Sequence, residues 1–308
     1  MSQLQISYAL NKYVLAAVLA ALAGPWSLAH AATQVEERRP ASPQGAVEVI
    51  NVAGSIDIQG WDRPEVEVSG TVGKDVERVE LTGDANRTTV RVVLPSGRHS
   101  SSNDGAATLV VHVPANSSLS TSLVSSDLNV SAVRGDMKLQ TVSGNITGDG
   151  GGDLRANSVS GNVTLKAAAA KSIEVRTISG DISLTGGDAD TEVTTISGNA
   201  KMSLGSVTRA RLKTISGTLS ANLGTRPDAQ IEGESVSGDV KLEFASAPSA
   251  DFEIETLSGS IDNCFGPKPT ATHRYGPGLR LTFKTGDTRG SVKVSTKSGD
   301  VRLCAKGA

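Results

Sequence analysis

Apolar and polar residues alternate in short runs over most of the 308-residue chain, and pairs of runs meet at repeated Ser-Gly dipeptides. Alternation with a period of two is typical of a β-strand that buries one face. The aligned serines lie 17 to 21 residues apart from Ser143 to Ser258, and a final step of 40 leads to Ser298. A degenerate copy at 125–127 begins the series. The pattern therefore predicts stacked strand pairs with a period of roughly nineteen residues.

Each Ser-Gly dipeptide is predicted to form a bend between the two strands of a copy. The residue before the serine is also apolar in seven of eight copies, as Ile178 is before Ser179, so the alternation changes phase there. A strand cannot change face without a bend, and glycine tolerates positive φ. We expect Ile178 and Ile182 to face the core, and the Thr177 hydroxyl to fill the bend and bond nearby backbone. The predicted corner glycines are Gly144, Gly161, Gly180, Gly198, Gly217, Gly238, Gly259 and Gly299.

One copy alone buries too few apolar side chains to offset the entropy of ordering its residues. Stacking lets each strand pair its backbone with the equivalent strand of the next copy and closes a continuous core. The sequence therefore predicts an all-β protein, a parallel β-solenoid with about 18–21 residues per rung, each rung advancing ~4.8 Å. Right-handed winding is expected, as for other parallel crossovers.

Composition changes along the chain divide it into segments. Residues 1–31 combine one lysine, an apolar run at 13–24 and a small-x-small site at 29–31, which predicts a signal peptide; a retained membrane anchor is the alternative. We interpret 32–45 as a flexible linker and 46–118 as an N-terminal β region that caps the solenoid. The repeats occupy 119–265. Residues 266–290 are expected to leave the stack and include a capping strand, and 291–308 to form the last rung and tail.

Two cysteines, Cys264 and Cys304, lie six residues after their serines, in identical phase. If two full rungs separated them, their Cα atoms would be about 9.5 Å apart, beyond the ~7 Å limit for a disulfide. If 266–290 loops out, the two residues stack at about 4.8 Å. We favour the second arrangement, with a disulfide that clamps the C-terminal rung. Lys297, which replaces the apolar corner residue of that copy, suits an end position.

An outward column of charged residues precedes the serines by five positions. A solvated face with ion pairs between rungs explains it, and a binding face is the alternative. Four glutamates would form an acidic patch, for which a weak calcium site is a further alternative. The column is Lys138, Arg155, Glu174, Glu192, Arg211, Glu232, Glu253 and Lys293, and the candidate binding face is Arg176, Arg211, Glu232, Glu234, Glu253 and Glu255.

The sequence predicts neither a catalytic site nor a cofactor. After signal cleavage, 29 basic and 32 acidic side chains remain, which argues against nucleic acid as a partner. The histidines have no metal-ligand spacing, and the serines lack a nucleophile motif. A polysaccharide-active β-helix enzyme is the alternative, although the mature chain offers few aromatic platforms for sugar. We also expect no membrane span in the mature chain, because no second apolar run is long enough.

The repeated T-[IV]-S-G-[DN]-[IV] phrase, with GSIDIQGWDRPEVEVSG at 54–70 and HRYGPG at 273–278, resembles the bacterial β-strand-repeat family described as putative adhesins, a domain of unknown function. The resemblance spans about 46–304 and implies a right-handed β-helix without catalytic residues. We expect an exported cell-envelope module that binds a protein or a glycan or acts as a scaffold. A periplasmic location is favoured over the cell surface or the medium, and an envelope-stress or signalling factor is the alternative function.

Overall fold

The protein is described from a computed structural model, which covers residues 33–95, 105–272 and 277–306. The predicted signal peptide at 1–31 and residues 273–276 lie outside these ranges. The described residues form 23 β-strands and no helix. The strands are β1 (Thr33–Pro40), β2 (Ala46–Trp61), β3 (Glu65–Val72), β4 (Arg78–Gly83), β5 (Arg87–Val93), β6 (Ala107–Pro114), β7 (Ser118–Val133), β8 (Met137–Ser143), β9 (Ile146–Gly150), β10 (Leu154–Ser160), β11 (Val163–Ala167), β12 (Ser172–Ser179), β13 (Ile182–Gly186), β14 (Asp190–Ser197), β15 (Ala200–Ser216), β16 (Leu219–Ser237), β17 (Val240–Phe244), β18 (Ala250–Ser258), β19 (Ile261–Asn263), β20 (Thr270–Ala271), β21 (Leu279–Lys284), β22 (Gly290–Ser298) and β23 (Val301–Ala305).

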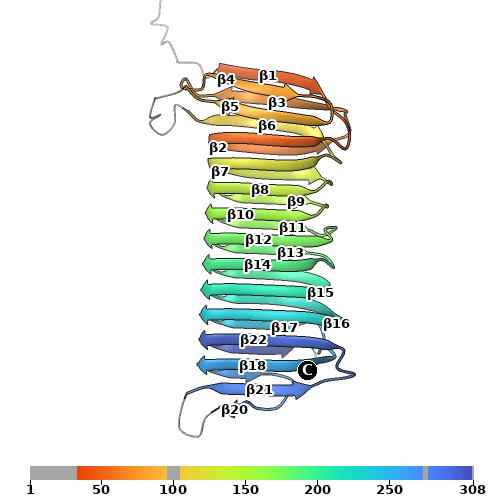
Figure 1. The fold of residues 1–308 in the computed structure, drawn as a ribbon, viewed down its shortest axis with the longest axis vertical. Helices are drawn as coiled ribbons and strands as arrows, with labels where there is room; N and C mark the ends of the chain where they lie inside the picture. The colour runs from red at the N-terminus through yellow and green to blue at the C-terminus, as the bar shows by residue number, and fades with distance from the viewer. Residues whose placement is uncertain (1–32, 96–104, 273–276, 307–308) are drawn as a thin grey trace, which may run out of the picture. The chain divides into compact units, whose positions relative to one another are not determined.

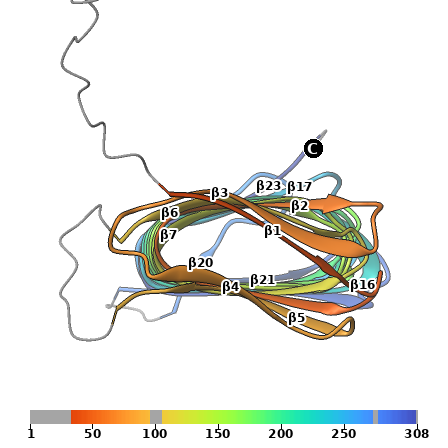
Figure 2. The same cartoon turned by 90° about the horizontal axis from the view of Figure 1, so that it is seen from above.

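The strands form one continuous, mostly parallel sheet that folds back on itself into two facing layers (Figures 1 and 2). We call the layer before each Ser-Gly corner the first face, and the layer after it the second face. Strands β8, β10, β12, β14, β22 and β18 belong to the first face, and β9, β11, β13, β17, β23 and β19 to the second. The long strands β2, β7, β15 and β16 run through both. Inward side chains of the two faces meet in a single apolar core.

Equivalent residues of successive copies are paired in register. Ile173 pairs with Leu154 on one side and with Thr191 on the other, and Ser179 pairs with Ser160 and Ser197. Each column of the repeat therefore becomes a ladder along the stack. Columns −6 and −4 before the serine, and +3 and +5 after it, are almost entirely buried.

The corner differs from the prediction in one respect that matters for function. Ile182 is 2% exposed and faces the core, but Ile178 is 48% exposed and faces outward, so its predicted burial is wrong. The reason is that Thr177 already occupies the inward position, at 3% exposure, and simple alternation then turns Ile178 to the outside. The bend follows Ile178 and does not precede it.

The hydroxyls at the bend also differ from expectation. Those of Thr214 and Thr256 donate to the backbone oxygens of Ser216 and Gly299, at 3.2 and 3.1 Å. The other six have no hydrogen-bond partner among the described residues; they belong to Thr141, Ser158, Thr177, Thr195, Ser235 and Thr296. These side chains therefore act mainly as small inward fillers.

The glycine after each serine occupies a conformation that other residues rarely adopt. The eight corner glycines have φ between 123° and 151°. At Gly180 a Cβ would also overlap the carbonyl oxygen of Gly161 in the neighbouring copy. The Gly180 N–H donates to the carbonyl oxygen of Ser197 at 3.1 Å, so the corner backbones are stacked in direct hydrogen-bonded contact.

The two ends of the stack carry antiparallel strands. At the N-terminal end β3 pairs with β6, β4 with β5, and β1 with β3. The prediction of a flexible linker at 32–45 is therefore wrong, because residues 33–40 form β1. Its charged side chains suit an edge strand, and Arg38 Nε lies 3.0 Å from Glu67 Oε2 of β3.

At the C-terminal end the strands do not stack in chain order. Strand β22 pairs with β16 on one side and with β18 on the other, and β23 lies between β17 and β19 in the same way. Figure 1 shows β22 above β18 although it follows β18 in the chain. We call β22 and β23 the inserted rung. The prediction that Lys297 lies at an end of the stack is therefore wrong: its neighbours are Val236 and Leu257.

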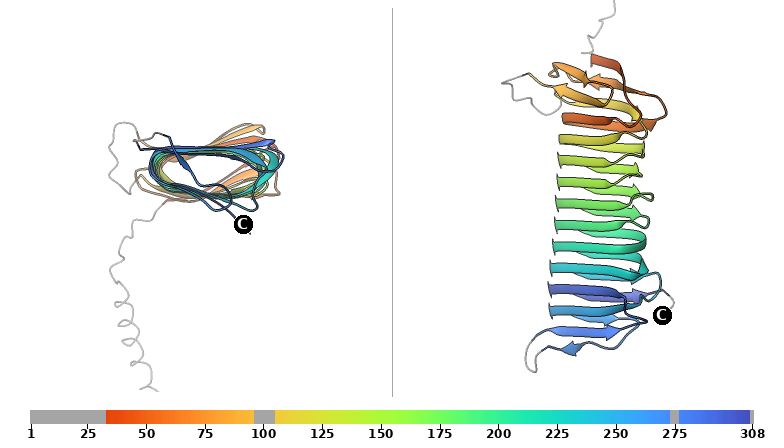
Figure 3. Two further views of the ribbon diagram at one scale, coloured as in Figure 1. Left: turned by 90° about the horizontal axis from the view of Figure 1, so that it is seen from below. Right: turned by 45° about the vertical axis from the view of Figure 1, so that its right-hand side comes forward.

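Beyond β18 on the first face lies β21, which runs antiparallel to it, and the short strand β20 pairs with the outer edge of β21; Figure 3 shows the same end from below. All four phenylalanines of the chain gather here. The rings of Phe252 and Phe283 are stacked with centroids 4.4 Å apart, and Phe265 lies edge-on to both. The cluster also includes Phe244 and closes the core beneath the last rungs.

Replacing a corner glycine tests the stacking of the corners. We expect Gly180→Ala to lower the free energy of unfolding by about 2 kcal/mol or more, because alanine must hold a positive φ and meets the Gly161 carbonyl. Gly233→Ala is the control, since a Cβ there meets Val240 at an ordinary 3.4 Å. It should change stability by less than about 1 kcal/mol in urea unfolding. Equal effects would contradict the corner geometry.

Paired cysteine substitutions test the order of the rungs. In the inserted order, Glu232 is the partner of Lys293, whereas Glu232 and Glu253 are two strands apart, or about 9.6 Å. Glu232→Cys with Lys293→Cys should therefore form a disulfide, and Glu232→Cys with Glu253→Cys should not, because the limit is ~7 Å. Non-reducing peptide mapping distinguishes the two. The reverse result would mean that the rungs stack in chain order.

Candidate functional site

Nine large apolar side chains lie in one exposed line along the corner. Each is the residue before a corner serine or its equivalent, and their exposed fractions run from 38% to 55%. They come from the carboxyl ends of the first-face strands, whose arrowheads point left in Figure 1. We call this set the aliphatic row: Val52, Val124, Val142, Val159, Ile178, Ile196, Ile215, Val236 and Leu257.

Strand register makes the aliphatic row continuous. Val142, Val159, Ile178 and Ile196 each lie one strand from the next, so their spacing is ~4.8 Å. Lys297 of the inserted rung is the single interruption, between Val236 and Leu257. Ten positions give the row a length of about 40 Å.

A shallow hollow of about 510 Å³ runs beside the C-terminal half of the row. Ile196, Ile215 and Val236 line it, as do Lys213 and Lys297. Lys213 Nζ lies 2.8 Å from Glu234 Oε2, which also lines the hollow. The hollow therefore combines three members of the row with charged side chains.

A second ladder runs alongside, formed by the Asp or Asn that follows six of the eight corner glycines and by Asp127 of the degenerate copy. The side-chain oxygen of one copy accepts from the backbone N–H of the next: Asp181 from Asn199 at 2.8 Å, and Asn162 from Asp181 at 3.0 Å. This Asx ladder fixes the corner from outside. The recurrence of Asp or Asn in the repeated phrase is the sequence signal for this ladder. Its acceptors are Asp127, Asn145, Asn162, Asp181, Asn199, Asp239 and Asp300.

The charged column of the first face is taken up by pairing between strands. Arg176 lies 2.7 Å from Glu174 and 3.2 Å from Glu192. Arg211 donates to Glu232 at 2.6 Å, and this hydrogen bond lowers the pKa of Glu232 below its ordinary value. The candidate binding residues are thus members of a solvated ion-pair network, worth little individually.

The four glutamates of the predicted acidic patch line one small hollow, but the inserted rung places Lys293 and Ser295 between the two pairs. Lys293 lies between Glu232 and Glu253, with its Nζ 3.8 Å from Glu253 Oε2. Glu255 pairs with Arg280, and Glu234 with Lys213. Over 33–95, 105–272 and 277–306, no three His, Cys, Asp or Glu side chains form a group that could hold a metal ion. The calcium alternative therefore has no metal-binding group among the described residues.

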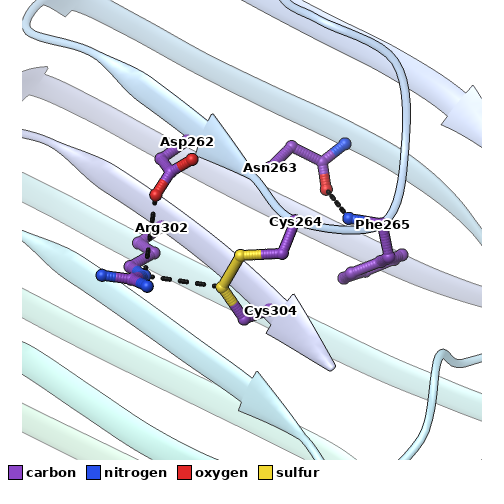
Figure 4. Close-up of a disulfide and its surroundings, with 6 residues drawn as sticks. All are labelled: Asp262, Asn263, Cys264, Phe265, Arg302 and Cys304. Atoms are coloured by element: carbon purple, nitrogen blue, oxygen red, sulfur yellow. Dashed lines mark hydrogen bonds and ion pairs between the residues drawn. A yellow bond between two sulfur atoms is a disulfide. The ribbon is translucent and has the colours of Figure 1, made fainter. Parts of the chain in front are cut away.

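The two cysteines lie in adjacent rungs, as predicted: Cys264 directly follows β19, and Cys304 lies on its neighbour β23 (Figure 4). Their sulfurs are at disulfide distance and their Cα atoms are 4.9 Å apart. The Cys264 N–H donates to Leu303 at 2.9 Å, which anchors the loop after β19. Because β23 is inserted, the last rung in the sequence is not the last rung of the stack. The bridge joins this inserted rung to the outermost rung, at the end of β19.

In the part of the chain that the structure describes, no helix is suited to crossing a bilayer. The profile of the Toastrack DUF4097 family matches residues 49–304, most of the chain, so the protein belongs to this family. The resemblance inferred from the repeated phrase is therefore confirmed. No curated protein matches the chain.

The chain is also similar to solved structures of bacterial proteins. The chain is similar to a "putative lipid binding protein" of Parabacteroides distasonis, with 12% identity over 88% of this chain and 96% of that one, and a TM-score of 0.51. It is also similar to a "putative adhesin" of Bacteroides fragilis, with 11% identity, coverage of 89% and 98%, and a TM-score of 0.43. At these identities the likeness concerns the fold alone.

Substitution of Asp300 tests the Asx ladder. The Asp300 carboxylate accepts hydrogen bonds from the backbone N–H and from the hydroxyl of Ser260, each at 2.8 Å. These bonds lower the pKa of Asp300. Asp300→Ala should cost about 1 kcal/mol at neutral pH. Asp300→Asn keeps the acceptor, as Asn162 and Asn199 do elsewhere in the ladder, and should cost less.

The same pair of proteins gives a pH dependence with a definite sign. Because the folded-state pKa of Asp300 is lowered, its charge stabilises the fold above the ordinary pKa of about 4. That contribution is lost as pH falls through the folded-state pKa. The advantage of Asp300 over Asn should therefore shrink between pH 6 and pH 3 in urea unfolding. An advantage that grows on acidification would contradict the assignment.

Proposed function

We propose that this protein is an exported, non-catalytic binding or scaffold module of the bacterial cell envelope, and that the aliphatic row is its interaction surface. The observation that carries the proposal is the row itself. Contiguous exposed apolar patches of several hundred Å² are uncommon on monomeric proteins and mark interaction sites. Nine aliphatic side chains at one repeat position, each 38% to 55% exposed, form such a patch on an inextensible β frame.

We also propose that the fold is a right-handed β-solenoid with 18–21 residues in a typical rung. The paired residues Ile173 and Leu154 are 19 positions apart, and Ile231 and Ala210 are 21 apart, which supports that period. Right-handed crossovers between parallel strands are the rule, which supports the handedness.

Two features support the proposed export. The lysine, apolar run and small-x-small site at the N-terminus support a cleaved signal peptide. The Cys264 and Cys304 pair supports an oxidising compartment, where a disulfide persists. We propose the periplasm as that compartment. Protease treatment of intact cells tests this location, since an exposed surface protein would be degraded and a periplasmic one spared.

Site-specific photocrosslinking in intact cells tests the interaction surface. A benzophenone side chain at Ile196 should give discrete adducts, because this position is exposed within the row. The matched control is Ser183, which is exposed on β13 of the second face. Mass spectrometry of the adducts identifies what is bound. Equal labelling at both positions, or none at Ile196, would contradict the proposed surface.

A further inference from the structure

We infer that the partner of the aliphatic row is the aliphatic row of a second copy of this chain, packed edge to edge in the opposite direction. This inference rests on the proposed function, because it takes the same surface and names its occupant. It is argued from the repeat distance of the row, its area and the place of its one charge.

The repeat distance selects the kind of partner. Side chains in the row recur every ~4.8 Å, the spacing of strands in a sheet. An α-helix advances 5.4 Å per turn, and an extended peptide presents one face every ~6.6–6.8 Å, so both lose register within a few positions. A second copy has the same spacing along the whole row. Its side chains can therefore lie opposite those of Val159, Ile178 and Ile196 and keep register along the whole row.

The exposed area is close to what a specific interface needs. The uninterrupted part of the row has eight members, from Val52 to Val236, and at their exposed fractions these supply on the order of 600 Å² per copy. A standard interface buries about 800 Å² per partner. The exposed corner serines, such as Ser179 and Ser197, border the row on one side and provide the polar rim.

Lys297 decides the relative direction of the two copies. In a parallel pairing about an axis along the stack, each residue would face its own equivalent, and two Lys297 ammonium groups would meet. Like charges facing one another in an apolar seam are costly. In the opposed arrangement a two-fold axis passes between Val159 and Ile178, and Val52 pairs with Val236. Lys297 and Leu257 then lie beyond the overlap, where the ammonium group stays in water.

Such a contact is isologous and closes as a dimer. Two stacks joined along their corners leave all four broad faces free, including the ion-paired first face of each copy. The pairing therefore converts a single module into a two-sided scaffold. Because each copy buries its aliphatic row in this one contact, the arrangement does not extend into fibres.

Sedimentation equilibrium of the protein purified after export tests the inference. The wild-type protein should be a dimer at tens of µM. Ile178→Asp places a charge beside the proposed axis and should weaken association at least 100-fold, whereas Ser183→Asp, an equally exposed position on β13, should leave it unchanged. Unfolding curves for both variants verify that they fold. A wild-type monomer at 100 µM, or a dimer that Ile178→Asp does not weaken, would overturn the inference.

A covalent test fixes the direction. Val159→Cys mixed with Ile178→Cys should give a disulfide-linked heterodimer under mild oxidation. Leu257→Cys alone should give none, because the two Leu257 positions lie at opposite ends. A Leu257→Cys homodimer would overturn the opposed arrangement. If the wild-type protein is monomeric but Ile196 photocrosslinks to another macromolecule, the inference fails and the proposed function stands. If Ile196 gives no adduct either, both fail.

Discussion

The structure depends on the direct stacking of one corner upon the next. At each corner the glycine has no Cβ, so its backbone can lie against the carbonyl of the glycine in the adjacent copy, and its N–H reaches the neighbouring serine carbonyl. A side chain at Gly180 would force the two corners apart and, with them, the strands on both faces. The register of every ladder follows from this contact. Thr177 turns inward, Ile178 outward, and Asp181 reaches the next copy because the corner between them is fixed.

Much of this arrangement is predictable from the sequence, because each copy of the repeat places the same kinds of side chain at the same positions. The buried columns follow from phase, and the adjacency of Cys264 and Cys304 follows from phase once residues 266–290 are taken out of the stack. A capping strand within 266–290 was predicted, but its antiparallel direction was not. The predicted burial of Ile178 was wrong for a general reason. An apolar residue need not be buried, since more than half of a protein surface is apolar. Strand β1 was missed because its charged residues show no alternation, and only its pairing with β3 makes it a strand.

The position of the inserted rung could not be predicted from the period of the repeat. Every copy shares one phase, so alternation cannot distinguish a stack in chain order from one in which β22 enters between β16 and β18. Charge does distinguish them. Chain order would place Glu232 against Glu253 and Glu234 against Glu255, whereas insertion puts Lys293 and Ser295 between those pairs. Opposite charges on neighbouring strands are favourable and like charges are not. The disulfide then ties the inserted rung to its outer neighbour.

The same corner that builds the stack also produces its interaction surface, since the residue that alternation turns outward is aliphatic in nearly every copy. Hydroxyl-radical footprinting of dilute, monomeric protein tests this central point most directly. Ile178 and Ile182 belong to one copy and have the same intrinsic reactivity, but they are 48% and 2% exposed. The account predicts that Ile178 is oxidised several-fold faster than Ile182. Equal, slow oxidation of both would mean that the corner residue is buried, and would contradict the account.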